Sequence, residues 1–375
     1  MDLDNEKNKT TLLNRTTKEP LAIDARGDIR WYSTLWSQHI FEPWSNGHNM
    51  MLSKRKQSSN YYNDLIESDW LGRIYNEYSF SNKIGSTNAN SKSATVIHHD
   101  LLRLPNGNIL ATVSDGSRYQ QSVLAEISYK SGKAIKIIDF RKILPKSFWK
   151  NFKESKSTIA APKYDWLHNN SVEYDQNDHS ILTSNRNQDL IMKLDYKTKK
   201  IKWLYSGKKK TAWPKKYQKY VLTPVKGTKI PGAQHGLNLL NDINHNPNQE
   251  KILLYDNNVN VTNGNKKTSK KYSQAVQYYI DVKNKKIKQT WSYGKSLGKK
   301  NFTDVIGFAQ RLNNGNTLID FGFKQRGKES NVIEVTPDKK QVFNATIKNK
   351  ASKTYTYRVY RLPLYNKNYI FDATI

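Results

Sequence analysis

A hairpin signature that recurs four times constrains the fold of this chain more than any other feature. Each copy pairs an apolar strand that follows a turn with a second hairpin whose turn is rich in lysine. The first halves begin at Leu101, Ser171, Ile243 and Ala309, and the second halves at Leu124, Ile191, Gln277 and Asn331. Apolar and polar residues alternate within them, and Asn-Gly or Asn-Asn turns separate them, which indicates β-strands.

Recurring four-stranded units predict a β-propeller, in which each unit forms one blade of a closed ring. The segment IDARGDIRWY, from Ile23, resembles the second half of a further unit. The segment YRVYRLPLYNKNYIF, from Tyr357, supplies strands that could close the ring with the N-terminal end. Six blades fit the length of 375 residues best. An array of β-sandwiches is the alternative, and it is disfavoured because sandwiches rarely repeat one hairpin signature.

We therefore predict an all-β chain with a flexible tail at residues 1–20 and a six-bladed propeller at residues 21–375. The first twenty residues are polar and lack the apolar segment of a signal peptide. No apolar run reaches the length of a transmembrane helix. Residues 60–74 and 141–152 are the better candidates for short helices.

The charge is strongly positive, with 62 Lys and Arg against 32 Asp and Glu, a formal net charge of +30. Such a balance suits nucleic acid, an anionic surface or an anionic small substrate. Much of the lysine lies in short runs with asparagine where turns are expected, such as KTKKIK and KNKKIK. A coding bias that fills surface loops with Lys and Asn explains these runs as well as a specific polyanion site does.

Histidine is the residue type most suggestive of chemistry. His98 and His99, then His168, then His235 precede the apolar strands of three successive repeats. Equivalent positions on successive blades converge on the central channel of a propeller, so we predict that these side chains cluster there. A lone histidine in a β protein is usually structural or exposed, and the recurrence is what favours a functional site.

Arg186 follows His168 across one hairpin, at the end of the strand predicted at residues 180–184. Its guanidinium would suit a tetrahedral oxyanion if it faces the axis, and it would be an ordinary surface arginine if it faces the rim. Other motifs are weak. The segment GKSLGKK, from Gly294, has the wrong spacing for a phosphate loop, and no calcium loop is evident. The chain has no cysteine, which excludes disulfides, a thiol nucleophile and thiolate metal sites.

Nearly the whole chain, from IDARGDIRWY to YRVYRLPLY, resembles the bacterial arylsulfate sulfotransferases that do not use phosphoadenosine phosphosulfate. The motifs that carry the resemblance are HHDLLRLPNGNIL, LAEISYKSGKAIKIIDF, DWLHNNSVEYDQNDHSILTSNRNQDLIMKLD, QHG, ILLYDNN and YIDVKNKKIKQTWSYG. The block at residues 165–195 is the most specific, because its His-x-Asn and Ser-x-Arg lie in one hairpin.

The resemblance implies a six-bladed propeller with its active site in the central channel. The nucleophilic histidine of the family falls on His235, and the groups that bind the sulfuryl oxygens fall on His168, Asn170 and Arg186. The remaining catalytic histidine falls on the His98–His99 pair, and we favour His99, with His98 binding substrate. The implied reaction moves a sulfuryl group from a phenolic sulfate ester to a phenol by a ping-pong mechanism through a sulfohistidine, without metal or cofactor.

The chain departs from the family in several ways. Well-known members carry an N-terminal β-sandwich domain used in dimer contacts, and here only a short tail precedes the propeller, so a homodimer stays open. The family is typically exported, yet no signal peptide is evident, and the cytoplasm is not excluded. Partners are expected to be small phenols and their sulfates, with no nucleic acid and no membrane span.

Two rival functions have different signatures. A non-catalytic propeller that binds an anionic glycan or protein would lose binding, but no turnover, when His235 is replaced. A quinone-dependent propeller dehydrogenase would need a calcium site, and the required Asp/Glu cluster is not apparent.

Overall fold

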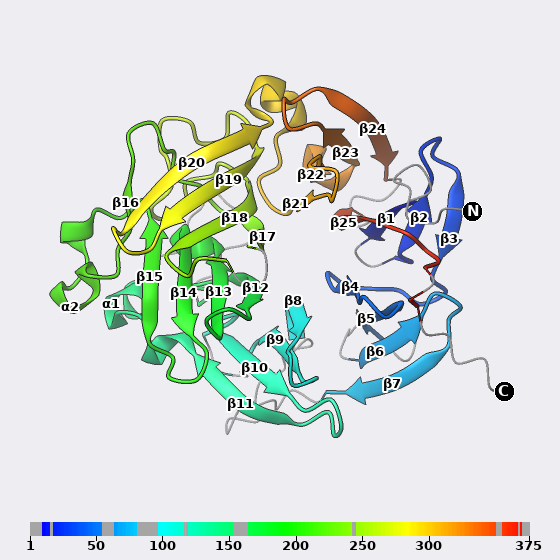
Figure 1. Cartoon of the computed structure of the whole chain (residues 1–375), viewed down its shortest axis with the longest axis horizontal. Coiled ribbons are helices and arrows are strands. Elements are labelled where there is room, and N and C mark those ends of the chain that lie inside the picture. The colour runs from blue at the N-terminus through cyan, green and yellow to red at the C-terminus, as the bar shows by residue number, and fades with distance from the viewer. Residues whose placement is uncertain are drawn as a thin grey trace.

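Six sheets arranged in a ring form the molecule, antiparallel except for one short edge strand, and the strands of each sheet lie side by side from the centre of the ring to its rim (Figure 1). The computed structural model describes residues 10–15, 18–54, 64–80, 97–115, 117, 119–152, 164–241, 245–349, 355–366 and 368–369. The predicted six-bladed β-propeller is confirmed. Within the described residues every sheet is one of these six blades, and none forms a separate N-terminal sandwich.

The first three blades follow one another along the chain, each with its innermost strand first. Blade 1 contains β4 (Phe41–Pro43), β5 (His48–Ser53), β6 (Asp64–Asp69) and β7 (Ile74–Ser79). Blade 2 contains β8 (Ile97–Arg103), β9 (Ile109–Val113), β10 (Val123–Ile127) and β11 (Ala134–Asp139). Blade 3 contains β12 (Asn169–Asp175), β13 (Ser180–Asn185), β14 (Leu190–Asp195) and β15 (Ile201–Ser206).

The remaining blades complete the ring. Blade 4 contains β17 (His235–Leu239), β18 (Gln249–Asp256), β19 (Gln274–Asp281) and β20 (Lys286–Tyr293), with β16 (Thr223–Pro224) added in parallel at its outer edge. Blade 5 contains β21 (Phe308–Arg311), β22 (Thr317–Lys324), β23 (Glu329–Val335) and β24 (Gln341–Lys348). Blade 6 contains β25 (Thr356–Leu362), β1 (Thr10–Arg15), β2 (Leu21–Ile23) and β3 (Ile29–Tyr32).

The two ends of the chain close the ring within blade 6, where β1 pairs antiparallel with β25. The pairing sets Leu12 opposite Tyr360 and Leu13 opposite Val359. The predicted closure by C-terminal strands is therefore confirmed. The prediction of a flexible tail at residues 1–20 is wrong for residues 10–15, because this polar-looking segment gains a partner strand from the far end of the sequence. Residues 1–9 and 16–17 lie outside the described residues.

Of the two predicted short helices, only the one at residues 141–152 is correct. It corresponds to η2 (Phe140–Lys142) and α1 (Lys146–Lys150), whereas residues 64–69 form β6. All six side chains of β6 are buried between neighbouring strands and blades, so the strand lacks the alternation that marks a half-exposed strand. The other helices are η3 (Arg186–Gln188), η4 (Lys210–Ala212), α2 (Lys215–Gln218), η5 (Lys295–Asn301) and η6 (Gln325–Gly327).

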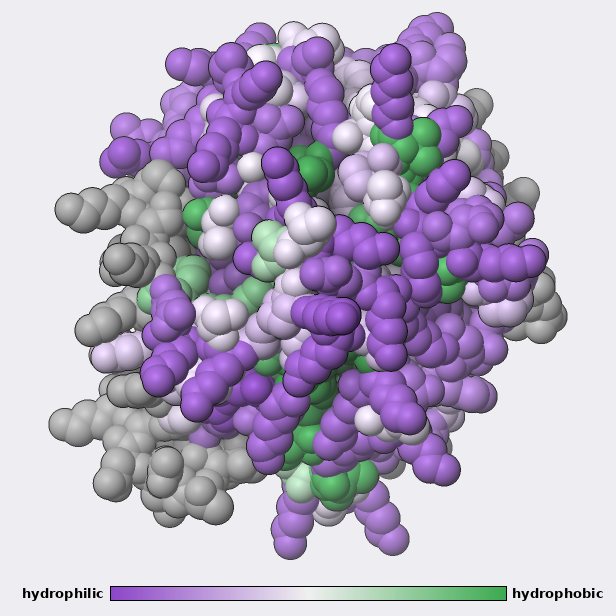
Figure 2. Space-filling model, turned by 90° about the vertical axis from the view of Figure 1, so that its left-hand side faces the viewer, coloured by the Kyte–Doolittle hydropathy of each residue, from purple (hydrophilic) through white to green (hydrophobic). Residues whose placement is uncertain are grey.

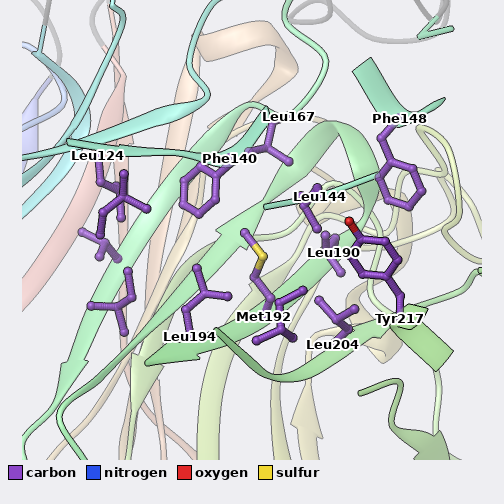
Figure 3. Close-up of a cluster of buried hydrophobic side chains, with 14 of the residues drawn as sticks. Leu124, Phe140, Leu144, Phe148, Leu167, Leu190, Met192, Leu194, Leu204 and Tyr217 are labelled. Atoms are coloured by element: carbon purple, nitrogen blue, oxygen red, sulfur yellow. The ribbon is translucent and has the colours of Figure 1, made fainter. Parts of the chain in front are cut away.

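Apolar side chains fill the wedges between adjacent blades. Figure 3 shows the cluster between blades 2 and 3, where Leu124 and Phe140 lie near Met192 and Leu194. Tyr217 of α2 and Phe148 of α1 extend this cluster toward the rim. Trp166 and Trp203 are fully buried and pack within the fold. Because each blade buries its faces against its neighbours, the innermost strands are held in fixed positions around the channel.

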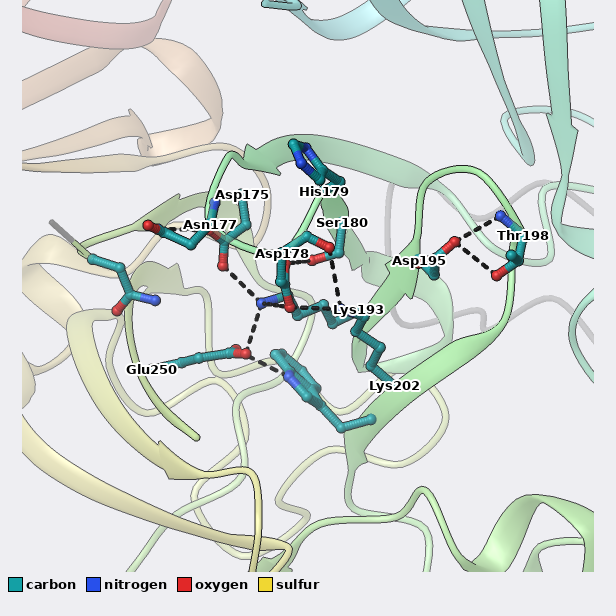
Figure 4. A network of polar contacts seen from close by, with 12 residues as sticks. Asp175, Asn177, Asp178, His179, Ser180, Lys193, Asp195, Thr198, Lys202 and Glu250 are labelled. Atoms are coloured by element: carbon teal, nitrogen blue, oxygen red, sulfur yellow. Dashed lines mark hydrogen bonds and ion pairs between the residues drawn. The ribbon is translucent and has the colours of Figure 1, made fainter. Parts of the chain in front are cut away.

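A buried ion cluster links blade 3 to blade 4 (Figure 4). The ammonium of Lys193 lies 2.7 Å from both Asp175 and Glu250 and 3.1 Å from Asp178. These three carboxylates are close enough to share a metal ion, but Lys193 already neutralises part of their charge. Burial opposes the charge on Lys193, and the carboxylates, Glu250 first, outweigh that effect and raise its pKa. The cluster is an electrostatic cross-link between blades.

We predict that Lys193→Met lowers the free energy of unfolding by about 3–5 kcal/mol, because it leaves three carboxylates without their buried cation. Lys202→Met serves as the control, since the half-buried Lys202 contacts Asp178 from the edge of the cluster, and its loss should cost at most about 1 kcal/mol. Urea unfolding curves of the two variants give the comparison. Equal, small losses would show that the cluster does not stabilise the fold.

Candidate active site

The histidines singled out in the sequence come together at the centre of the ring, at the start of three inner strands. His98 and His99 belong to β8, His168 directly precedes β12, and His235 begins β17. All four side chains are buried. The Nδ1 atoms of His98 and His99 lie 2.8 Å apart, and the rings of His99 and His168 are 4.6 Å apart at their centroids. The predicted convergence of His98, His99 and His168 is confirmed.

A local backbone feature aims these side chains at the axis. His99 and His168 have φ values of 50° and 52°, and Gly236 has a φ of 56°. Each lies next to a register shift of its inner strand, the signature of a β-bulge, which turns side chains out of the regular alternation. His235 lies one residue before the left-handed position, so it is not strictly equivalent to His99 and His168.

The tautomer of His235 follows from its neighbours. Its Nδ1 lies 2.9 Å from the carbonyl oxygen of Ala233 and 2.7 Å from Oδ1 of Asn257. The amide of Asn257 is oriented by its own NH₂ group, which donates to the carbonyl oxygens of Thr303 at 3.0 Å and Ile306 at 2.8 Å. Both neighbours of Nδ1 are therefore acceptors, and Nδ1 must carry the proton.

The lone pair of His235 consequently resides on Nε2. Only the backbone N–H of Ile306 approaches it among the described residues, at a long 3.4 Å. Burial lowers the pKa of His235 well below its usual value, and the charges of Arg186 and His168 lower it further. The imidazole is neutral at pH 7, and the Nε2 lone pair of a neutral imidazole can act as a nucleophile.

Arg186 lies at the end of β13, at the first residue of η3, and is fully buried. The alternative of a surface arginine is wrong. Its guanidinium donates to Oδ1 of Asn187 at 2.8 Å and to the carbonyl oxygen of Asp304 at 3.4 Å. Burial lowers the pKa of Arg186, while Asp165 and other carboxylates oppose this effect. The charge of Arg186 lowers the pKa of both His168 and His235.

Two further side chains complete the cluster. Nδ1 of His168 lies 2.5 Å from the Asp165 carboxylate, which fixes the orientation of the ring. Burial, followed by Arg186, lowers the pKa of His168 well below its usual value, and burial raises that of Asp165. Asn170 donates to the carbonyl oxygen of Gln234, the residue before His235. Its Oδ1 has no hydrogen-bond partner within the described part of the chain.

Sequence reasoning missed three residues of this cluster. His39 precedes β4 of blade 1, has a φ of 61°, and stacks on His99 with 5.2 Å between ring centroids. Its position before an inner strand is the signal that could have found it. Asn257 lies in the ILLYDNN motif but had no assigned role. Asp165, at the start of the most specific block, was likewise unassigned.

We predict that His235 is neutral at pH 6.5 and protonated on Nδ1. Histidine-labelled protein observed by two-dimensional ¹⁵N NMR should show one ring with this tautomer whose signals disappear in His235→Gln. The burial and the charge of Arg186 that depress its pKa give the physical reason. A doubly protonated ring, or a proton on Nε2 of this residue, would contradict the assignment.

A six-bladed propeller whose channel holds a buried arginine together with buried histidines defines a class of protein. Comparison with known families agrees with this class and narrows it. The model of the arylsulfotransferase (ASST) family matches residues 2–358, and the chain belongs to that family.

Two curated relatives are arylsulfate sulfotransferases named AssT. The one from Escherichia coli O6:H1 (strain CFT073) is 28% identical over 174 residues, covering 44% of this chain and 28% of the relative. The one from Lelliottia amnigena is 28% identical over 167 residues, covering 42% of this chain and 27% of the relative. The matched region thus spans little more than a quarter of the length of each relative.

Among solved structures, a putative 6-phosphogluconolactonase from Bacteroides fragilis has a TM-score of 0.46 at 11% identity, covering 96% of this chain and 99% of that one. The propeller domain of Cps50 (Swd1) from Myceliophteria thermophila has a TM-score of 0.45 at 10% identity, with 92% and 84% covered. In the described part of the chain, no helix has the length and apolar character needed to span a membrane.

Proposed function

We propose that the protein is an arylsulfate sulfotransferase that moves a sulfuryl group from a phenolic sulfate ester to a phenol through a sulfohistidine at His235. The observation that carries the proposal is the Nδ1-protonated His235, whose Nε2 lone pair meets only a long contact from the N–H of Ile306, in a channel that also holds the buried Arg186. Family membership supports the same chemistry.

In the first half-reaction, Nε2 of His235 attacks sulfur while the bond from sulfur to the aryl oxygen breaks in line. The new N–S bond leaves a sulfohistidine, and the departing phenolate must be protonated. His99 is the proposed acid. Burial first, and then His168, lower its pKa in the free protein, but a bound sulfate anion would oppose this shift, so that His99 takes up a proton with the donor.

In the second half-reaction, an acceptor phenol replaces the first product. His99, neutral again after giving up its proton, removes the proton of the phenol, whose oxygen attacks the sulfur. The N–S bond breaks, its electron pair returns to Nε2 of His235, and a new sulfate ester leaves. Donor and acceptor use one site in turn, so the kinetics should be ping-pong.

The groups around His235 would stabilise the sulfuryl oxygens in both steps. Arg186, His168 and Asn170 are the proposed contacts, and His98 would add a further one, since its Nε2 lacks a hydrogen-bond partner among the described residues. In-line transfer of this kind depends mainly on positioning and charge stabilisation, which buried, pre-oriented groups supply. The mechanism uses no metal and no organic cofactor.

An apolar surface adjoins the nucleophile and would hold the aryl ring. Val305, Ile306 and Tyr357 form a buried cluster, and the backbone of Ile306 contacts Nε2 of His235. Tyr357 also lies against His39, with 4.6 Å between ring centroids. The physiological partners are thus proposed to be small phenols and their sulfates rather than nucleic acid.

The location and assembly of the protein follow the family only by resemblance. On that basis we propose that it acts outside the cytoplasm, in the cell envelope or beyond it. A homodimer is compatible with this proposal, and cell fractionation together with light scattering of the purified protein would test both statements.

We predict that the protein releases 4-nitrophenol from 4-nitrophenyl sulfate only when a phenol acceptor is present, beyond one initial turnover. His235→Ala should reduce this release by at least about 10⁴-fold, because it removes the nucleophile. His179→Ala is the matched control, since His179 is exposed on the turn between β12 and β13 and should leave the rate unchanged. Acceptor-independent release would indicate a sulfatase, and no release from the folded protein with several donors would indicate a binding propeller.

We predict that Arg186→Gln lowers kcat/KM about 10²–10³-fold and also moves the acid limb of the pH profile upward. Arg186 depresses the pKa of His235, so its loss lets that pKa rise toward the usual value. The reactive neutral imidazole is then lost at a higher pH as the solution is acidified. Arg186→Lys keeps the charge and should keep the limb near its original place. A limb that does not move in Arg186→Gln would contradict this role.

A further inference from the structure

One long segment of this chain is rich in lysine and has no acidic residue. Residues 196–241 contain no Asp or Glu, and they contain twelve lysines: Lys197, Lys199, Lys200, Lys202, Lys208, Lys209, Lys210, Lys215, Lys216, Lys219, Lys226 and Lys229. Most of the segment forms β15, η4, α2 and β16, which lie at the outer edges of blades 3 and 4, far from the channel (Figure 1), whereas its last residues form β17, which carries His235. The proposed reaction makes no use of the twelve lysines.

Part of this segment borders a groove of about 450 Å³ at the rim of blade 3. Three pieces of chain form it: the end of η2 with Ile143, the turn between β14 and β15, and helix α2 with the residues after it. Five lysines line the groove, namely Lys142, Lys199, Lys200, Lys216 and Lys219, and the lining contains no carboxylate. In size the groove matches a ligand site rather than a packing defect.

The bottom of the groove is part of the packed core, and lysine side chains surround it. Tyr217 belongs to the apolar cluster between blades 2 and 3, and its hydroxyl donates to the carbonyl oxygen of Ile143 at 3.0 Å, so helix α2 is tied to η2. The ammonium groups of Lys216 and Lys219 lie over the rings of Tyr217 and Tyr220, at 5.2 and 5.1 Å from the centroids. Within the described residues, none of the five lysines forms an ion pair with a carboxylate.

Figure 2 shows the side of the molecule on which α1 and α2 lie. Hydrophilic side chains project over most of this face, and small hydrophobic areas are visible between them. The five lysines are exposed, whereas Tyr217 and Ile201 are buried. The face therefore presents unneutralised ammonium groups around a shallow apolar floor.

We propose that this groove binds an anionic polysaccharide, a glycan chain that carries sulfate or phosphate groups. Exposed lysines from three separate pieces of chain can each contact a different charged group along an extended ligand, and ammonium groups on flexible stems tolerate variable spacing. The apolar floor, with the half-buried Tyr220, offers a surface for sugar rings. The groove would hold the enzyme on a polyanionic matrix while the channel stays open to small phenols.

Other polyanions fit this face less well. Single-stranded nucleic acid needs exposed aromatic rings for base stacking, and none of the large hydrophobic residues that are exposed in the described chain lines the groove. No arginine lines the groove either, although arginine is the residue that most often binds phosphates and base edges. A membrane surface would be met by protruding apolar side chains, and here the apolar residues lie at the bottom of the groove.

The test measures binding of the full chain to dextran sulfate by isothermal calorimetry, with neutral dextran as the blank. The groove variant replaces four lysines by glutamine: Lys199→Gln, Lys200→Gln, Lys216→Gln and Lys219→Gln. The control variant makes the same change in net charge at the rim of blade 5, where four exposed lysines lie around β23 and β24: Lys328→Gln, Lys339→Gln, Lys340→Gln and Lys348→Gln.

We expect the groove variant to bind at least about tenfold more weakly and to show a shallower dependence of log K on log salt, since fewer counterions are released. The control variant should differ from the unaltered protein by less than about threefold. Equal losses in the two variants would show attraction to net charge alone and would overturn the proposal. An unchanged affinity of the groove variant would also overturn it.

Competition separates the classes of polyanion. Single-stranded DNA, polyglutamate and vesicles with anionic lipid should each displace dextran sulfate less well than a second sulfated glycan does. A stronger displacement by any of the three would reject the polysaccharide assignment. The release of 4-nitrophenol should be unchanged in the groove variant, so that this test and the test of the proposed function can fail separately.

Discussion

The antiparallel pairing of β1 with β25 is the interaction on which the rest of the structure depends. It joins the two ends of the chain in one sheet and leaves no blade open at the seam, so the inner strands enclose a channel. The pairing also reaches the site directly: the side chain of Asn14 in β1 donates to the carbonyl oxygen of His39 at 2.8 Å, and Tyr357 in β25 packs against the ring of His39. The pairing that closes the ring therefore also fixes the position of a histidine in the channel.

Burial in the closed channel sets the chemistry of the histidines. Without water around them, the rings of His99, His168 and His235 have lowered pKa values, and Arg186 remains as the nearby cation. A hydrogen-bond chain from Thr303 and Ile306 through Asn257 then selects the tautomer of His235. Orientation and desolvation of this kind are what the proposed nucleophile requires.

The positive charges in the channel and those at the outer rim lie in different environments. In the channel, Arg186 acts at short range in a buried setting. At the rim of blade 3, exposed lysines act together over a wide area that water and salt screen. The first arrangement suits a small sulfate ester, and the second suits an extended polyanion, so the two proposed sites need not compete.

The sequence by itself determined the four-stranded repeats, the six blades and the candidate residues at the starts of the inner strands, because hairpin patterns and turn residues are local signals. The sequence could not identify β1 as a strand, because its partner strand lies more than 300 residues away. It also could not identify β6, because all its side chains are buried and the strand lacks the alternation of a half-exposed strand. It could not choose between axis and rim for Arg186, or show that His39 stacks on His99. Only the tertiary structure decided these points, since burial, tautomer and cross-blade contact arise when distant strands close the ring.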